Sequence, residues 1–234
     1  MNTITKTIIW KESILFKKQT FLIFILYYLG TIYGFIRILD KTNSAINLTA
    51  DQISVYMFIY SVVNSILCGA IIICISSITE IRETVSIPLL ISLRPISYIW
   101  IGQYIFVCTT TYIASFVGSI TLLIYVNIFL HENHLINLKM VLLCFIIGPL
   151  IAYILISIDL FLSWVVKFTI LSLVPTLLVP GIMLIFILNN TVLVIQYNPG
   201  LMEIVFLSFL HSLEIYILSK VLNILPKEIF IGNT

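Results

Sequence analysis

Long apolar stretches separated by short polar segments limit most strongly how this chain can fold. A helix needs about 20 apolar residues to cross a bilayer. Six stretches are close to or above that length: residues 20–39, 54–79, one within 96–130, 140–158, 168–188 and 204–222. Only 9% of the 234 residues are charged and the mean hydropathy is +1.17, whereas soluble domains carry about 25% charged residues. We therefore expect an all-α polytopic membrane protein, a single transmembrane domain over 1–234 with six transmembrane helices.

Two boundaries between the expected spans are difficult to place. The stretch 96–130 is too long for one straight crossing, so we expect an interfacial entry, with Gly102 and Gly118 as soft points. We place the turn between the fourth and fifth spans at 159–167, because Asp159 and Lys167 mark its two ends. A charge at mid-bilayer is costly, which favours interfacial anchoring for both residues over a buried functional acid.

The distribution of lysine and arginine predicts the orientation, since cytoplasmic loops carry an excess of both. With the N-terminus in the cytoplasm, the inner side holds Lys6, Lys11, Lys17, Lys18, Arg82, Arg94, Lys167, Lys220 and Lys227, and the outer side Arg37, Lys41 and Lys139. We therefore expect both termini to be cytoplasmic in a bacterial plasma membrane. The outer loops are then 40–53, 131–139 and 189–203, the last an interfacial or re-entrant segment.

The N-terminal segment 1–18 does not resemble a signal peptide, because charges interrupt it and no long apolar region with a cleavage site follows. Its apolar residues recur at roughly helical spacing, and Trp10 suits the headgroup region. We expect an amphipathic helix lying on the cytoplasmic face. A specific docking role and a plain juxtamembrane anchor both fit this pattern.

The segment 80–97 places two prolines in a polar loop on the cytoplasmic side. Pro88 ends one helix and suits the first turn of another, and Pro95 restricts Arg94 in the same way. The intervening "PLLISLR" is about two turns of helix, too short to be stable alone in water. It therefore needs packing from its own spans or from a partner, although an ordinary re-entry loop has the same prolines.

The motifs of this loop resemble the cytoplasmic loop of ABC type-2 transporter permeases. They are "EIR" at 80–82, "PLLIS" at 88–92, "RPI" at 94–96 and "WIGQ" at 100–103. The six-span layout and the N-terminal helix are also similar. The chain departs from the family where Glu83 and Thr84 stand at a place that often holds glycine.

The resemblance implies that 88–93 is a short coupling helix docking on a separate ABC ATPase subunit, and that two permease subunits form a homo- or heterodimer. It implies an ATPase-docking surface made of Glu80, Arg82, Glu83, Pro88, Leu89, Leu90, Ser92 and Arg94, with Lys11 and Glu12 as a second contact. ATP and magnesium would then be bound by the partner subunit.

The chain has no motif that would let it bind ATP or act as an enzyme. A G-x-x-x-x-G-K-[ST] phosphate loop is absent, and so are H-E-x-x-H, a nucleophile elbow and paired carboxylates. Four cysteines fall inside apolar stretches, with spacings that fit neither zinc nor disulfides. The "HENH" of 131–134 suits a solvated loop better than a metal site. We expect no cofactor, no metal and no nucleic-acid partner.

His211 and Glu214 are polar groups inside the sixth expected span, on one helical face. A pair in this position could carry protons or contact substrate, as in a proton-coupled secondary transporter. It could equally fasten the helix to a neighbour. The energy source is thus expected to be a partner ATPase, with a proton gradient as the alternative.

The nature of the cargo is only weakly indicated. The spans are rich in Ile, Leu, Phe and Tyr, which suits an amphipathic or hydrophobic cargo. Permeases of the family resembled here export peptides, drugs, lipid-linked sugars or haem. An antimicrobial or cytolytic peptide is the expected cargo, and interfacial anchoring is the other explanation for the tyrosines.

Overall fold

The computed structural model describes six stretches of the chain: residues 3–15, 21–46, 49–73, 95–129, 138–165 and 200–226. The expected fifth span, most of the coupling loop and most of the last outer segment lie outside these described residues. The described elements are all helical: α1 (Thr3–Leu15), α2 (Phe21–Ile46), α3 (Ala50–Ile72), α6 (Ile96–Phe129), α7 (Leu138–Leu142), the π-helix η3 (Leu143–Ile147), α8 (Gly148–Val165) and α11 (Leu201–Ile224).

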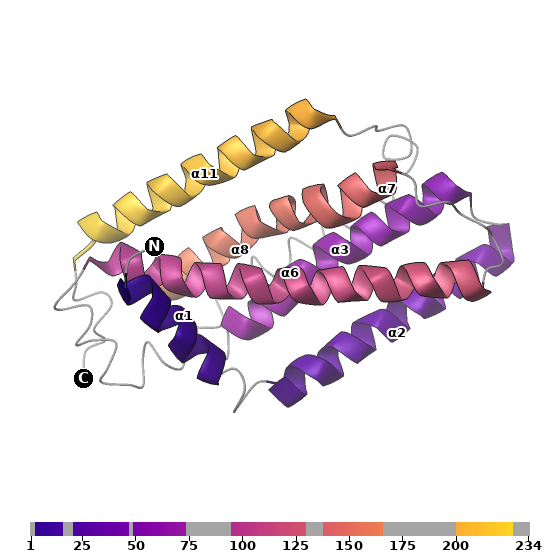
Figure 1. Ribbon diagram of the computed structural model, residues 1–234, viewed down its shortest axis with the longest axis horizontal. Helices are drawn as coiled ribbons and strands as arrows, with labels where there is room; N and C mark the ends of the chain where they lie inside the picture. Colours follow the sequence, from indigo (N-terminus) through magenta and orange to yellow (C-terminus); the bar gives the residue numbers. More distant parts are fainter. Residues whose placement is uncertain are drawn as a thin grey trace.

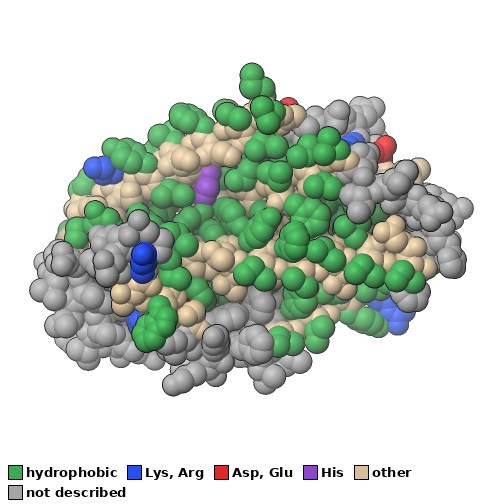
Figure 2. Space-filling model, in the orientation of Figure 1, with side chains coloured by type: hydrophobic (Ala, Val, Ile, Leu, Met, Phe, Trp, Pro, Cys, Tyr) green, Lys and Arg blue, Asp and Glu red, His purple; other side chains and the backbone are tan. Residues whose placement is uncertain are grey.

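Four of the described helical segments are long and apolar enough to cross a membrane. They are Asp51–Ile72, Ile96–Ile128, Leu138–Val165 and Leu201–Ile224, which correspond to the second, third, fourth and sixth expected spans. The expected first span lies in α2, which is helical over Phe21–Ile46. The face shown in Figure 2 is covered mainly by hydrophobic side chains, with few charged groups among the described residues. The expected all-α fold is therefore confirmed for the described residues, four of whose helices are suited to a membrane.

The long helices lie side by side and have two distinct ends (Figure 1). At one end, here called the α1 end, Glu12 contacts Gln103 and Ser97 contacts Asn223. At the opposite end, Tyr125 near the end of α6 donates to Asp40 of α2. Consequently α3, α8 and α11 run toward the α1 end, whereas α2 and α6 run away from it (Figure 1).

Helix α3 forms the centre of the bundle because small residues let its neighbours approach closely. Tyr60 is fully buried against Gly118 of α6, where an added Cβ would lie 1.9 Å from the phenol oxygen. Ser61 and Ser115 form a hydroxyl–hydroxyl hydrogen bond of 3.1 Å between the same helices. Small and hydroxyl-bearing residues are typical of such close contacts between membrane helices.

Pro149 explains the π-helix that precedes α8. In η3 the backbone pattern is i to i−5, as the Gly148 N–H donating to the Leu143 carbonyl shows. The next donor in this pattern would be Pro149, which has no N–H, so the Cys144 carbonyl lacks its helical partner. The Ser61 hydroxyl donates to that carbonyl at 2.6 Å. A side chain of α3 thus satisfies a backbone group that proline leaves unpaired.

The glycines of α6 differ from their expected role. The helix is continuous for 34 residues, about 51 Å at 1.5 Å per residue, and passes through Gly102 and Gly118 without a break. Neither glycine is a soft point. Gly102 lies where α1 packs, with Ile8 2.9 Å from the position of an added Cβ.

We expected a turn at 159–167. This prediction is wrong for residues 159–165, because α8 continues to Val165. Asp159 is only 1% exposed, so it is not an interfacial anchor. The segment between Asp159 and Val165 contains neither glycine nor proline, and Ser163 and Trp164 are buried within it. Asp159 therefore does not mark the end of a helix; it is a charged residue inside α8 that faces the interior of the bundle.

Candidate functional site

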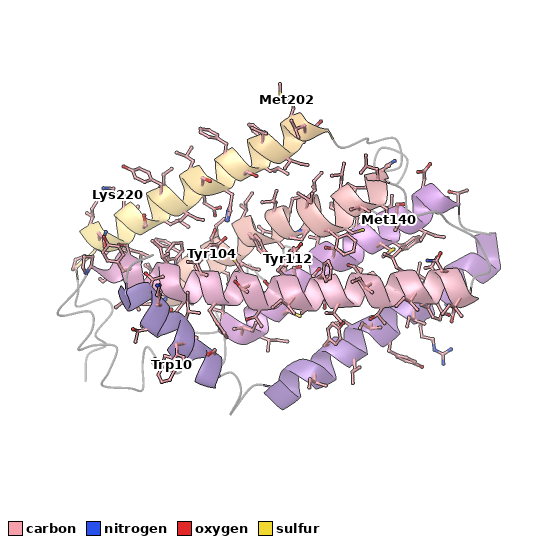
Figure 3. The ribbon with its side chains drawn as sticks, in the orientation of Figure 1. Trp10, Tyr104, Tyr112, Met140, Met202 and Lys220 are labelled. Carbon is pink, nitrogen blue, oxygen red and sulfur yellow. The ribbon has the colours of Figure 1, made fainter. Side chains whose placement is uncertain are left out.

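A polar cluster joins α6, α8 and α11 within the apolar bundle. Tyr104 Oη lies 2.5 Å from His211 Nε2, and His211 Nδ1 lies 3.1 Å from Glu214 Oε2. The Ser157 hydroxyl donates to Glu214 Oε1 at 2.6 Å. Three helices therefore contribute to one continuous hydrogen-bonded chain of four side chains. Figure 3 labels Tyr104 in the region between these helices.

Helical spacing explains how α11 supplies two members of the cluster. His211 and Glu214 are three positions apart, so they share one face of the helix. That face is turned toward α6 and α8: His211 is buried and Glu214 is partly buried. The 3.1 Å contact between His211 Nδ1 and Glu214 Oε2 lies within this face of α11; whether the pair carries protons or contacts substrate stays a prediction.

Each hydrogen bond between these four side chains involves an exchangeable proton. In one arrangement Tyr104 donates to Nε2 of a neutral His211, whose Nδ1–H donates to the Glu214 carboxylate. In a protonated imidazolium both ring nitrogens donate, so Nε2–H points to the tyrosine oxygen instead. Ser157 supplies a further donor to the carboxylate. The geometry thus accommodates both protonation states of the imidazole.

Aromatic rings enclose the imidazole. Trp100, fully buried, stacks on Tyr104 with 5.7 Å between ring centroids. The Tyr153 ring lies 6.3 Å from that of His211, and its hydroxyl donates to the Cys108 carbonyl at 3.2 Å. Apolar ring faces around a polar chain lower the local dielectric, so charge at this site interacts strongly with its surroundings.

A second buried polar contact fixes α1 to the bundle. Gln103 Nε2 donates to Glu12 Oε1 at 3.0 Å, and Trp164 Nε1 donates to Gln103 Oε1 at 2.9 Å. Glu12 is 1% exposed, so its carboxylate faces the bundle. The expected role of Glu12 in ATPase docking stays a prediction. Lys11 beside it is partly buried.

Most of the expected docking surface lies outside the described residues. This holds for Glu80, Arg82, Glu83, Pro88, Leu89, Leu90, Ser92 and Arg94. Within the described ranges, His, Cys, Asp and Glu residues form no group of three or more that could hold a metal ion. Two members of the polar cluster, Tyr104 and Ser157, were not expected from the sequence.

Comparison of the chain with protein-family models, curated proteins and solved structures found no match. The fold and the site together define a class: a helical membrane protein with a hydrogen-bonded chain of ionisable groups between its helices.

Proposed function

We propose that the chain is the permease subunit of an ATP-driven exporter, working as a dimer with separate ATPase subunits. The observation that carries this proposal is the position of α1. It packs on the first turns of α6, at the end of the bundle where α3 ends and α6 begins (Figure 1). An N-terminal helix packed on the start of α6, directly after residues 74–94, can move together with a subunit that docks on those residues.

Helix α1 is attached to α6 by both an apolar and a polar contact. Ile8 is buried against Gly102, and Glu12 is hydrogen-bonded to Gln103. Trp10, by contrast, is 66% exposed and points away from the bundle (Figure 3). A helix buried on one face with an exposed indole on the other suits the membrane–water interface.

The direction of the helices supports six spans with both termini in the cytoplasm. Helix α8 ends at the α1 end and α11 begins at the opposite end (Figure 1), as a further span between them requires. Lys6, Lys11 and Lys220 lie toward the α1 end, whereas Arg37, Lys41 and Lys139 belong to the opposite end. This separation agrees with a cytoplasmic α1 end.

Tyrosine-rich and aliphatic helices suit an amphipathic cargo, and a peptide is the cargo we propose.

Co-purification of the protein with an ATPase encoded by a neighbouring gene tests the proposal. Leu90→Glu should abolish ATPase binding and the stimulation of ATP hydrolysis, because it places a charge in the apolar face of the docking helix. Lys220→Glu, an exposed change at the same end of the bundle, is the control and should leave both unaltered. Unchanged binding by Leu90→Glu would refute the docking assignment.

A proton-coupled transporter is the second candidate, and the Tyr104–His211–Glu214 chain is the observation that favours it. In that case transport by the purified chain in vesicles would need no ATPase. It would stop when a protonophore dissipates the proton gradient, and Glu214→Gln would be inactive. ATP-dependent transport that persists with the protonophore would eliminate this candidate.

A further inference from the structure

We propose that Tyr104, Ser157, His211 and Glu214 form a proton-binding site, and that a proton bound there keeps α11 docked on α6 and α8. The proposal concerns how α11 is held. It therefore applies whether ATP or a proton gradient drives transport.

Helix α11 packs against the core through apolar side chains that are mostly only partly buried. Among its 24 residues, His211 and Leu222 are the buried ones, while Met202, Phe209 and Tyr216 are 81%, 66% and 59% exposed. In the described part of the chain, polar contacts join α11 to its neighbours at two places: the cluster, and the Asn223–Ser97 pair. Its position therefore depends strongly on the state of the cluster.

The charge of the cluster depends on His211. When the imidazole is neutral and Glu214 is ionised, the four side chains carry one negative charge. Besides the cluster itself, the titratable groups on the described elements packed against α11 are Tyr98, Cys108, Tyr112 and Tyr125 of α6, Tyr153 and Asp159 of α8, and Cys144 of η3. Asp159 is two residues beyond Ser157, about 200° around the helix. None of these groups can supply a positive charge, and α6 contains no Lys or Arg.

Binding of one proton removes the net charge. The proton adds to His211 Nε2, giving an imidazolium that donates through Nε2–H to Tyr104 Oη and through Nδ1–H to Glu214. The carboxylate keeps the Ser157 hydrogen bond, and the Tyr104 O–H, which can no longer donate to Nε2, turns to the neighbouring Cys108 side chain. Loss of the proton leaves an uncompensated carboxylate among apolar side chains, which is unfavourable. Movement of α11 that brings Glu214 to water is then favoured.

The sign of the pH effect follows from proton counting. The docked state binds one proton more than the released state, so docking is favoured as pH falls and is lost as pH rises. If one proton is coupled to docking, the ratio of docked to released α11 changes by up to about tenfold for each pH unit.

Photocrosslinking measures docking without thiol chemistry, which would itself depend on pH. Benzoylphenylalanine replaces the partly buried Leu218 in the full chain, reconstituted in phosphatidylcholine vesicles. Crosslinks to peptides of α6 and α8 are quantified by mass spectrometry from about pH 5 to about pH 9, a range that brackets the ordinary pKa of histidine. The yield should fall as pH rises. A flat yield over this range would overturn the proposal.

Variants separate a proton site from a passive contact. Glu214→Gln keeps a carbonyl acceptor for Ser157 and places an NH2 donor opposite His211 Nδ1, which a neutral imidazole can accept. Because this variant has no buried carboxylate, its crosslinking should be high at about pH 9 and should not fall as pH rises. Glu203→Gln, on the same helix but outside the cluster, should keep the wild-type dependence. Tyr104→Phe removes the oxygen that receives the imidazolium, so its midpoint should fall by up to about one pH unit. Wild-type pH dependence in a folded Glu214→Gln protein would refute the assignment. If that variant does not fold, the absence of a midpoint shift in Tyr104→Phe would do so.

Discussion

Gln103 of α6 donates to Glu12 of α1 through an amide nitrogen that lies 3.0 Å from the carboxylate. The two residues are 91 positions apart in the sequence, and the same glutamine side chain accepts from Trp164 of α8. One amide therefore links three elements at the α1 end of the bundle, and its donor and acceptor are both used.

Replacing this amide should destabilise the protein more than its size suggests. Gln103→Leu leaves the Glu12 carboxylate and the Trp164 N–H without this partner, and we expect a loss of about 2–4 kcal/mol in the free energy of unfolding. Thermal unfolding in detergent measures the loss. Asn127→Leu, at an exposed position on the same helix, is the matched control and should change stability little. Equal stability of the two variants would contradict the proposed linkage.

Gly118→Ala should separate α3 from α6. An added Cβ would lie 1.9 Å from Tyr60 Oη, and the tyrosine ring cannot bend away, so overpacking should cost about 1–3 kcal/mol. Gly34→Ala is the control, because no atom lies within 4 Å of its added Cβ. Adding Tyr60→Phe to Gly118→Ala should recover part of the loss. Failure of this double variant to recover any stability would show that the phenol oxygen is not the obstacle.

Ser61→Ala should expose the unpaired carbonyl created by Pro149. Removal of the hydroxyl leaves the buried Cys144 oxygen without its 2.6 Å donor, an effect of about 1–3 kcal/mol. Ser115→Ala retains that donor and should cost less. Equilibrium unfolding of both variants distinguishes them, and the interpretation fails if Ser115→Ala is the more destabilised.

Asn223→Leu should loosen the start of α6. The Asn223 side chain accepts from the Ser97 N–H at 3.2 Å and donates to the Ser97 hydroxyl at 3.0 Å, so it satisfies one of the unpaired donors in the first turn of that helix. We expect faster amide exchange in the first turn of α6, with the exchange of α3 unchanged. Faster exchange in α3 as well would indicate global destabilisation instead.

The sequence predicts those features that depend on a single helix. Apolar length located the described spans, and a spacing of three placed His211 beside Glu214. Contacts between helices are different, because nothing local indicates which residues of two apolar helices meet. The sequence contains many tyrosines in apolar stretches, and nothing distinguishes Tyr104 from the others. Ser157 is likewise a single hydroxyl-bearing residue in an apolar stretch, without a local signal that it contacts Glu214. Asp159 was misplaced because a charge near the end of an apolar run has the same sequence signal whether it faces headgroups or a buried neighbour.

The small number of buried residues in α11 also bears on biogenesis. Because α3, α6 and α8 pack extensively with one another, whereas the apolar side chains of α11 that contact the core are mostly only partly buried, these three helices can assemble before α11 leaves the ribosome. The last helix would then be added to a largely finished core, and truncation before Leu201 should still yield a protease-resistant fragment.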